Sequence, residues 1–465
     1  MKRLFSAPTT VNLELTELCN VKCRHCYNFW RDESMGVNTV SAEKMNDITN
    51  KLAEAGVFHV ILTGGEPFSK FALLESAISG LAKKNISMSV NSNLMLATEE
   101  RTKKLASYGV DHILTSLPSP DPELNDYIMN QPGAFDLIMK GIRATVAAGI
   151  RVSVNMVITR QTMGQVYEAG KLLSDLGCQK LFTTRAVPPT YSDTEQDDNY
   201  ILTFEEQKKA LDDALRVKED FGLMIGTLVS YPLCFLEDLD KYADFVGRGC
   251  PAQAGHRMSI NANGDVHACV HEEEGYGNIL TKSVKEIYQG QQYRRWHKGD
   301  FHYEGCKGCR YIDICESGCS MTSVGVYGEH SAKDPLYQGY HVFKKHYDLV
   351  VDKKVIEKIE KGVNFTVPKR IRFRKEDGFY LLNIRWGNSI TVDNDMAEFL
   401  MRYQELSEPF NINDLGKGKE EFLANLYFKD AIESEDININ TERDKLGLSF
   451  NFDALEPAPE IRNNV

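Results

Sequence analysis

The first 190 residues repeat one unit, in which a short apolar run is followed by a stretch with helical spacing of apolar residues. The runs are rich in Val, Ile, Leu and Thr and carry few charges, as buried parallel strands do. Six such units in a row predict a parallel sheet with helical crossovers, either an open sheet or the arc of a barrel. The expected strands are 11–16, 58–63, 86–91, 111–117, 151–157 and 179–184.

Polar and sulfur-containing residues follow the first two expected strands. The stretch "CNVKCRHC" (19–26) comes directly after the first strand, and "TGGEP" (63–67) comes directly after the second. Functional residues of such folds gather at the carboxyl ends of the strands, so these two stretches are expected to form one site.

The chain has eleven cysteines, and nine of them fall into two groups, which indicates metal ligation rather than a disulfide framework. The start, "MKRLFSAPTTVN", shows no secretion signal, so reduced thiols and a cytoplasmic location are expected.

Three closely spaced thiolates suit an iron–sulfur cubane, because each of its four irons needs an outside ligand and three cysteines leave one iron open. The spacing of Cys19, Cys23 and Cys26, with the "TGGEP" stretch and the six units, resembles the radical S-adenosylmethionine (SAM) superfamily. The resemblance implies a partial (β/α)6 barrel with a 4Fe–4S cluster on these cysteines. It also implies that SAM chelates the open iron and is cleaved to a 5′-deoxyadenosyl radical, which abstracts a substrate hydrogen. Zinc is the alternative, although the spacing does not fit a zinc knuckle.

The same resemblance suggests which residues contact SAM. Tyr27, directly after Cys26, matches the aromatic residue beside the adenine, and Glu66 is placed to accept a hydrogen bond from the SAM ammonium. Two departures from the pattern are Pro118, where an Asp is frequent, and the lack of an Arg near Met129. Each strand-end polar residue could equally belong to the scaffold. The expected SAM or substrate residues are Tyr27, Gly64, Gly65, Glu66, Pro67, Asn91, Asn93, Ser116, Asn155 and Arg185.

A second cysteine group begins at residue 250 and ends in "CKGCRYIDICESGC" (306–319). The run C-x2-C-x5-C-x3-C resembles the SPASM (twitch-type) domain that follows many radical SAM barrels acting on peptides and carries two auxiliary clusters. The resemblance implies one cluster on Cys250, Cys269 and Cys319 and another on Cys306, Cys309 and Cys315.

Each of these auxiliary sets is one thiolate short. Relatives carry a further cysteine after the quartet, where this chain has Tyr337 in "KDPLYQG". Asp334 and His256 are the candidate fourth ligands, and an open iron, a water ligand or an absent cluster are the alternatives. Cys178 is expected to pack in the core. Cys234 is expected either to pack in the core or to face the site as a hydrogen-atom donor.

The chain changes character at residue 366. The segment "KRIRFRKEDGFYLLNIRWGNSITVD" predicts a β-meander, and two amphipathic helices follow it, as in a small winged-helix domain. The pattern resembles the peptide-recognition element related to the pyrroloquinoline-quinone biosynthesis chaperone, to which a leader peptide adds a strand. The alternating cations of "KRIRFR" would suit an acidic leader. DNA binding is disfavoured, because the chain has a net charge of −12 and this segment has no basic recognition helix.

These features predict an α/β chain of several parts. The expected parts are a radical SAM barrel (1–190), a linker helix region (191–245), a SPASM domain (246–345), a linker helix (346–365), a leader-peptide domain (366–436) and a tail (437–465). No apolar run is long enough to cross a bilayer, so neither a membrane nor a nucleic acid is an expected partner.

The resemblances imply a radical SAM maturase that cross-links a ribosomally synthesised peptide through a thioether or a carbon–carbon bond. Its cofactors would be SAM, the radical SAM cluster and one or two auxiliary clusters. Its partners would be a precursor peptide and an electron donor of the flavodoxin or ferredoxin type. Two alternatives are an oxidase of the sulfatase-maturase type that forms formylglycine, and a non-catalytic iron–sulfur protein that binds peptides or transfers electrons.

Overall fold

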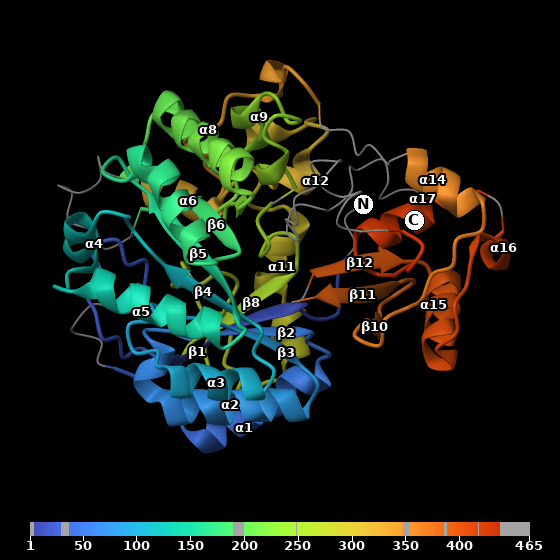
Figure 1. The fold of residues 1–465 in the computed structure, drawn as a ribbon, viewed down its shortest axis with the longest axis horizontal. Helices are drawn as coiled ribbons and strands as arrows, with labels where there is room; N and C mark the ends of the chain where they lie inside the picture. Colours follow the sequence, from blue (N-terminus) through green and yellow to red (C-terminus); the bar gives the residue numbers. More distant parts are fainter. Residues whose placement is uncertain are drawn as a thin grey trace.

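All six predicted strands form and lie side by side in one parallel sheet, each within one residue of its predicted bounds. A computed structural model describes residues 4–28, 37–188, 200–247, 249–346, 353–385, 388–416 and 418–437. The prediction of an α/β barrel arc is confirmed, and Figure 1 shows the curved sheet with helices outside it. The strands are β1 (Thr10–Thr16), β2 (His59–Gly64), β3 (Ser87–Asn91), β4 (His112–Ser116), β5 (Arg151–Ile158) and β6 (Lys180–Arg185).

The crossover helices bury one apolar face each against this sheet. In α1 (Ala42–Glu54) the buried positions are Met45, Ile48 and Leu52, at the three- and four-residue spacing that puts side chains on one helix face. Side chains cap several helix starts, as Asp121 does by accepting from the backbone N–H of Leu124 at 2.8 Å. The other crossover helices are α2 (Phe71–Lys83), α3 (Glu99–Ser107), α4 (Pro122–Met129), α5 (Ala134–Ala147), α6 (Val166–Asp175) and α8 (Phe204–Phe221).

The sheet is wider than the sequence predicts, because three short strands extend it to nine. β7 (Met224–Gly226) pairs with β6 at one edge, and β8 (Arg257–Ile260) pairs in parallel with β1 at the other. β9 (Val266–His267) then pairs with β8 in the antiparallel direction. The second cysteine group is therefore built directly onto the barrel sheet, beside the strand that leads into the first cysteine loop.

The cysteine-rich region before and after β8 and β9 is made of short helices around a mainly aromatic core. Trp296, Tyr288 and Tyr293 are fully buried there. Its helices are α9 (Leu233–Leu236), α10 (Val284–Tyr288), α11 (Gln291–Lys298), α12 (Ile312–Cys315) and α13 (Ser320–Tyr327).

The predicted β-meander and following helices form a C-terminal module with a core of its own, on one side of the barrel (Figure 1). Asp393 caps the first helix after the meander by accepting from the N–H of Met396 at 2.7 Å. The predicted tail lies almost entirely outside the described residues. The module contains α14 (Lys353–Glu360), β10 (Arg372–Lys375), β11 (Tyr380–Arg385), β12 (Asn388–Val392), α15 (Asn394–Leu406), α16 (Ile412–Leu415) and α17 (Glu420–Phe428).

Strand β10 fastens this module to the barrel. The Arg374 guanidinium donates to the carbonyls of Ala7, Pro8 and Gly56 at 2.7, 2.9 and 3.1 Å. Arg372 donates to the carbonyls of Phe58 and Asn85. The prediction that the cations of this strand serve an acidic leader is wrong for Arg372 and Arg374, because the barrel backbone takes up their donors.

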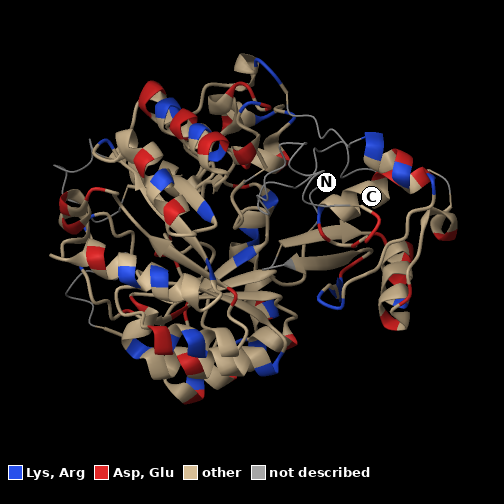
Figure 2. Cartoon of the chain, in the orientation of Figure 1, with Lys and Arg blue, Asp and Glu red and all other residues tan. Residues whose placement is uncertain are grey.

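Charges of both signs alternate along the outer helices, as Figure 2 shows for α8. Such mixed surfaces are those of helices that face water on one side. Within the described ranges, no helix is both long and apolar enough to span a bilayer.

Candidate active site

One large cavity, of about 690 Å³, occupies the inside of the barrel. Its walls run from the amino ends of the strands, at Thr10 and His112, to their carboxyl ends, at Thr63 and Ser116. Two sets of cysteines, which the sequence assigns to two different clusters, line this same cavity. They are Cys19, Cys23 and Cys26 of the first loop, and Cys250, Cys269 and Cys319 of the second group.

The first cysteine loop leaves β1 and is fastened to the end of α4. The N–H of Arg24 donates to the carbonyl of Ile128 at 2.8 Å, and its side chain donates to the carbonyl of Tyr127 at 3.0 Å. The sulfur of Cys23 lies 3.6 Å from that of Met129. The sequence has no arginine near Met129 in α4, and the structure brings Arg24 of the loop there instead.

The "TGGEP" stretch packs directly on the backbone of the cysteine loop. Gly65 donates to the carbonyl of Thr16 at 2.7 Å, and Glu66 donates to that of Leu18 at 2.8 Å. A Cβ at residue 65 would lie 2.4 Å from the Leu18 carbonyl oxygen, so only glycine permits this approach. The two predicted strand-end stretches therefore form one unit, as their positions in the sequence indicate.

The Glu66 carboxylate is fully buried between this unit and the end of β3. It accepts from the N–H of Phe68 at 2.9 Å, the Ser92 hydroxyl at 2.8 Å and the N–H of Asn93 at 2.8 Å. Burial raises the pKa of Glu66 to about 7, although these three hydrogen bonds act in the opposite direction.

Asn93 and Pro67 also serve the local structure. The Asn93 amide donates to Asn20 Oδ1 at 2.8 Å, and its oxygen accepts from the N–H of Met95 at 3.0 Å. Asn93 thus ties the end of β3 to the cysteine loop. Pro67 occupies the first turn of the short 3-10 helix Pro67–Lys70, where its fixed φ is favourable.

Two buried amide oxygens on the cavity have no hydrogen-bond partner among the described residues. They are Oδ1 of Asn28, directly after Tyr27, and Oδ1 of Asn155, on β5 beside Ser116 of β4. Buried polar atoms in proteins almost always have a hydrogen-bond partner. Two buried acceptors without a donor therefore indicate a ligand that carries donor groups. The ammonium and ribose hydroxyls of SAM are such donors, and the residues present therefore fit that cofactor.

Tyr27 lies next to a histidine that the sequence did not single out. Its ring centroid is 4.4 Å from that of His271, two residues after Cys269. Burial raises the pKa of Tyr27, with a contribution from the Glu14 charge, and burial lowers the pKa of His271 to about 4. Both side chains are therefore neutral at pH 7. A histidine two residues from a cysteine has no distinctive spacing, so only the fold reveals this contact.

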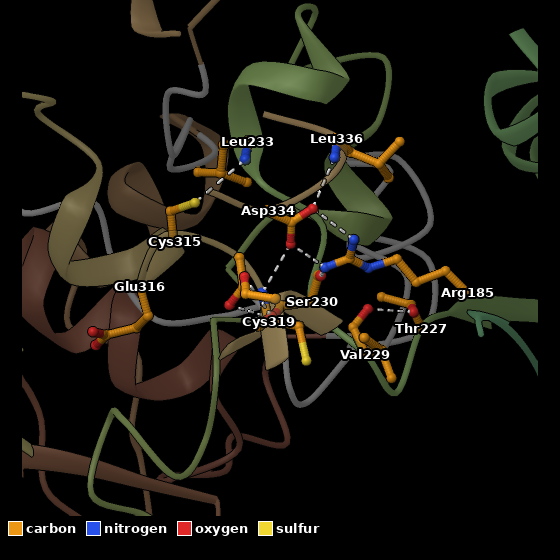
Figure 3. Close-up of polar contacts among 12 residues, drawn as sticks. Arg185, Thr227, Val229, Ser230, Leu233, Cys315, Glu316, Cys319, Asp334 and Leu336 are labelled. Atoms are coloured by element: carbon orange, nitrogen blue, oxygen red, sulfur yellow. Dashed lines mark hydrogen bonds and ion pairs between the residues drawn. The ribbon is translucent and has the colours of Figure 1, made fainter. Parts of the chain in front are cut away.

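Arg185 and Asp334 form a buried ion pair that differs from the predicted role of Asp334 (Figure 3). The two guanidinium nitrogens donate to the two carboxylate oxygens at 2.8 and 2.5 Å. Asp334 also accepts from the N–H of Cys319 at 3.1 Å and of Leu336 at 2.9 Å. Arg185 also lines the large cavity, so its contact with SAM or substrate stays a prediction. The sequence predicts that Asp334 binds iron. Instead, four protein donors surround the carboxylate, and the pair positions Cys319.

The three cysteines of the second set, Cys250, Cys269 and Cys319, all line the large cavity. Burial, followed by the nearby Cys319, raises the pKa of the Cys250 thiol to about 12. Burial, followed by the nearby Cys250, also raises the pKa of the Cys269 thiol. His256, the predicted fourth ligand, lines the same cavity, but its ring packs 5.0 Å from that of Phe5 and its Nδ1 lies 3.3 Å from the Thr9 hydroxyl.

The remaining cysteines lie apart from the large cavity. Cys178 packs in the barrel core, as predicted. Cys234 does not line the large cavity, which contradicts its predicted role as a hydrogen-atom donor there. It lines a smaller cavity together with Cys306, Cys309 and Cys315.

The cysteine sets suit clusters better than single ions. Across the described part of the chain, no three His, Cys, Asp or Glu side chains converge as one metal ion would require. A cubane binds each thiolate through a different iron, so its ligands surround a space instead of meeting at a point. The cysteines around the two cavities have that arrangement.

Comparisons with known proteins agree with this geometry. Residues 13–173 match the family described as Radical SAM superfamily, and residues 250–310 match the iron–sulfur cluster-binding domain SPASM. An AdoMet-dependent heme synthase of Oleidesulfovibrio alaskensis is 25% identical over 338 residues, which cover 70% of this chain and 85% of that relative. Mycofactocin maturase MftC of Mycolicibacterium smegmatis is 26% identical over 332 residues, which cover 68% and 79%.

Among solved structures, Streptococcus suis SuiB bound to its precursor peptide SuiA aligns with a TM-score of 0.57 at 18% identity. The alignment covers 73% of this chain and 77% of SuiB, and it supports the fold.

The fold, the cysteine loop and the family match identify residues 13–173 as a radical SAM domain, and the protein is an enzyme. Its second cysteine group belongs to a SPASM region, so its cofactors are SAM, a 4Fe–4S cluster and auxiliary iron–sulfur clusters. The SPASM match ends before Cys315, which lines the smaller cavity, and before Cys319, which lines the large one.

Proposed function

We propose that the protein matures a ribosomally synthesised peptide by forming an intramolecular cross-link, either a thioether or a carbon–carbon bond. The observation that carries this proposal is the shared cavity. The first cysteine loop, the second set of three cysteines and the C-terminal module all line it. The module contributes Ile384, Asn388, Ser389 and Ile390. A cavity of about 690 Å³ lies within the usual size range of ligand and cofactor sites.

The chain's own residues hold and orient the cofactors. When bound, SAM and the clusters supply one-electron cleavage of the sulfonium, abstraction of a substrate hydrogen atom and an acceptor for the electron released on bond formation. Cys19, Cys23 and Cys26 would hold the cluster. The amide oxygens of Asn28 and Asn155 would accept hydrogen bonds from SAM, and the carboxylate of Glu66 would balance its ammonium charge.

The electron count favours a cross-link. Joining two positions of a peptide removes two hydrogens: one leaves as an atom, the other as a proton together with one electron. An acceptor close to the substrate is then needed. Cys250, Cys269 and Cys319 line the substrate cavity itself, so a cluster held there would take up that electron. A donor of the flavodoxin or ferredoxin type would supply the electron that starts each turnover.

The leader of the precursor would bind at the edge of the C-terminal sheet. The strand order is β10-β11-β12, and β10 is engaged in docking to the barrel, which leaves β12 as the edge for an added strand. Three residues of β12 line the large cavity. A leader added there would deliver the following residues of the precursor to the cofactors.

Co-expression with short peptides encoded beside the gene tests this function. The peptide isolated by mass spectrometry should have lost two hydrogens, and a variant with alanine at Cys19, Cys23 and Cys26 should leave its mass unchanged. Fragmentation then locates the bond. An unmodified peptide, in cells whose purified enzyme still forms 5′-deoxyadenosine, would contradict the proposal.

A tetrapyrrole is the rival substrate, because a relative at 25% identity is named a heme synthase. That alternative gives no role to a sheet edge beside the cavity. Turnover of a heme precursor by the purified enzyme, with no change in any peptide, would favour it.

A further inference from the structure

A second cavity lies beside α9, apart from the large one, and four of its lining residues are cysteines. Cys306, Cys309 and Cys315 come from the C-x2-C-x5-C run, and Cys234 comes from α9, far earlier in the chain. The other lining residues are apolar or aromatic, and the exposed wall of the cavity is apolar. The structure thus completes a set of four thiols in a place where the sequence offers three.

Backbone N–H groups donate to sulfur on both sides of this cavity. The N–H of Gln338 donates to Cys234 at 3.3 Å, and the N–H of Leu233, at the start of α9, donates to Cys315 at 3.4 Å (Figure 3 shows the latter). Hydrogen bonds to sulfur are a means by which proteins tune iron–sulfur clusters. A cysteine that only fills a core, such as Cys178, needs no more than apolar neighbours.

The other candidates for a fourth ligand have other roles. Both oxygens of Asp334 bind Arg185 and backbone N–H groups. Tyr337 lines the same cavity, but its hydroxyl donates to the carbonyl of Gly305 at 2.8 Å and its ring packs against Tyr303. The backbone that follows Tyr337 is the segment that donates to Cys234, so the thiol lies beside the chain position where the sequence resemblance places a cysteine.

We propose that Cys234 is the fourth thiolate ligand of an auxiliary iron–sulfur cluster held with Cys306, Cys309 and Cys315. Each of the four thiols gives its proton to solvent and forms one sulfur–iron bond to a cluster of iron and sulfide that the assembly machinery or the reconstitution mixture supplies, and the ligation itself changes no oxidation state. With four protein thiolates this cluster has no open iron, which makes it an electron-transfer centre. The assignment concerns the SPASM region and does not depend on the identity of the substrate.

Iron content and spectroscopy of full-length variants test the assignment. Five full-length proteins are reconstituted anaerobically with ferric iron, sulfide and an excess of a thiol reductant: wild type, Cys234→Ala, Cys234→Ser, Cys315→Ala and Cys178→Ala. Cys178→Ala is the matched control, because it removes an equally buried thiol outside any proposed cluster. Iron and acid-labile sulfide per chain and the Mössbauer spectrum are then measured, and circular dichroism checks the fold.

Cys234→Ala and Cys315→Ala should both lose one cluster, about four irons per chain, or convert it to a three-iron form. Cys178→Ala should match wild type. Cys234→Ser, which retains nearly the same volume, should keep iron with an altered spectrum or lose it. The assignment fails if both Cys234 variants match Cys178→Ala in iron, sulfide and spectrum.

A measurement on the unmodified chain covers the case in which Cys234→Ala does not fold. Chelation of iron from the holoenzyme should make Cys234 and Cys315 reactive to an alkylating reagent together, while Cys178 stays unreactive. Equal alkylation of Cys234 before and after chelation would also overturn the proposal.

Discussion

Removal of the Asp334 carboxylate should destabilise the protein far more than the loss of a surface charge. Arg185 is 4% exposed and the Asp334 side chain is fully buried, so Asp334→Ala leaves a guanidinium in the interior without a counter-ion. Breaking a buried pair from one side costs about 3 to 5 kcal/mol, because the remaining charge stays desolvated. The variant also removes the acceptor of the Cys319 N–H, so the cluster ligand should lose its fixed position.

The matched control is Asp300→Ala. Asp300 pairs with Arg295 at 3.9 Å, and both side chains are about half exposed (45% and 49%). Such pairs contribute about 0 to 1 kcal/mol. Urea unfolding of the two variants should therefore differ by at least about 2 kcal/mol. If Asp334→Ala unfolds at the same urea concentration as Asp300→Ala, the Arg185–Asp334 pair does not contribute the expected free energy to stability.

A double variant separates stability from ligand positioning. In Arg185→Met with Asp334→Leu, both desolvation penalties disappear, and similar exchanges are neutral or stabilising elsewhere. The free energy of unfolding measured in urea should then return to within about 1 kcal/mol of the wild-type value or exceed it. The amount of iron bound through Cys319 should nevertheless stay below that of wild type. Full recovery of iron together with stability would show that the carboxylate has no part in placing Cys319.

Three further predictions follow from the same geometry. Burial raises the pKa of Glu66 from 4.5 to about 7. The SAM-free protein should therefore lose roughly 3 kcal/mol of unfolding free energy as the pH rises from 4.5 through 7. In Glu66→Gln, the unfolding free energy measured in urea should change less over this pH range. Gly65→Ala should displace the cysteine loop and abolish its cluster, while Gly164→Ala, whose Cβ meets nothing within 4 Å, should keep wild-type iron. Arg374→Gln removes three hydrogen bonds to barrel carbonyls, each worth about 1 kcal/mol or more. Limited proteolysis at the boundary of the C-terminal module should therefore become several-fold faster in this variant, and it should keep the wild-type rate in Lys375→Gln.

The sequence predicts those parts of the fold in which the physical environment of a short stretch fixes its residue types, as burial does for a central strand. Strands buried on both faces have to be apolar over their whole length, so β1 to β6 were found within one residue. β8 and β9 were not found, because four and two residues are too short to show a period. The "TGGEP" stretch was correctly predicted to meet the cysteine loop, and its two glycines permit that close approach of the backbones.

Contacts between distant residues could not be predicted in the same way. Arg185 and Asp334 are separated by 149 residues, and each one alone resembles a free functional group. Cys234 was likewise interpreted by itself, since nothing local distinguishes a core cysteine from a ligand. Arg372 and Arg374 look like a cationic strand face until the barrel carbonyls that they bind are known. For Asp334, Arg372 and Arg374, a polar side chain was predicted to meet a ligand and binds other parts of the protein instead.

The positions of the two auxiliary sets follow from what each must contact. Cys250, Cys269 and Cys319 line the cavity of the cofactors, so a cluster there can exchange an electron with a bound substrate. Cys306 and Cys309 flank Lys307, whose side chain is 75% exposed, so a cluster on the other set lies near the protein surface. An oxidation that proceeds inside the barrel must finally pass its electron to a partner outside. A surface cluster that only transfers electrons gains nothing from an open iron, which solvent could attack. A fourth thiolate from Cys234 would close that iron, while the set on the cavity can remain open toward the substrate.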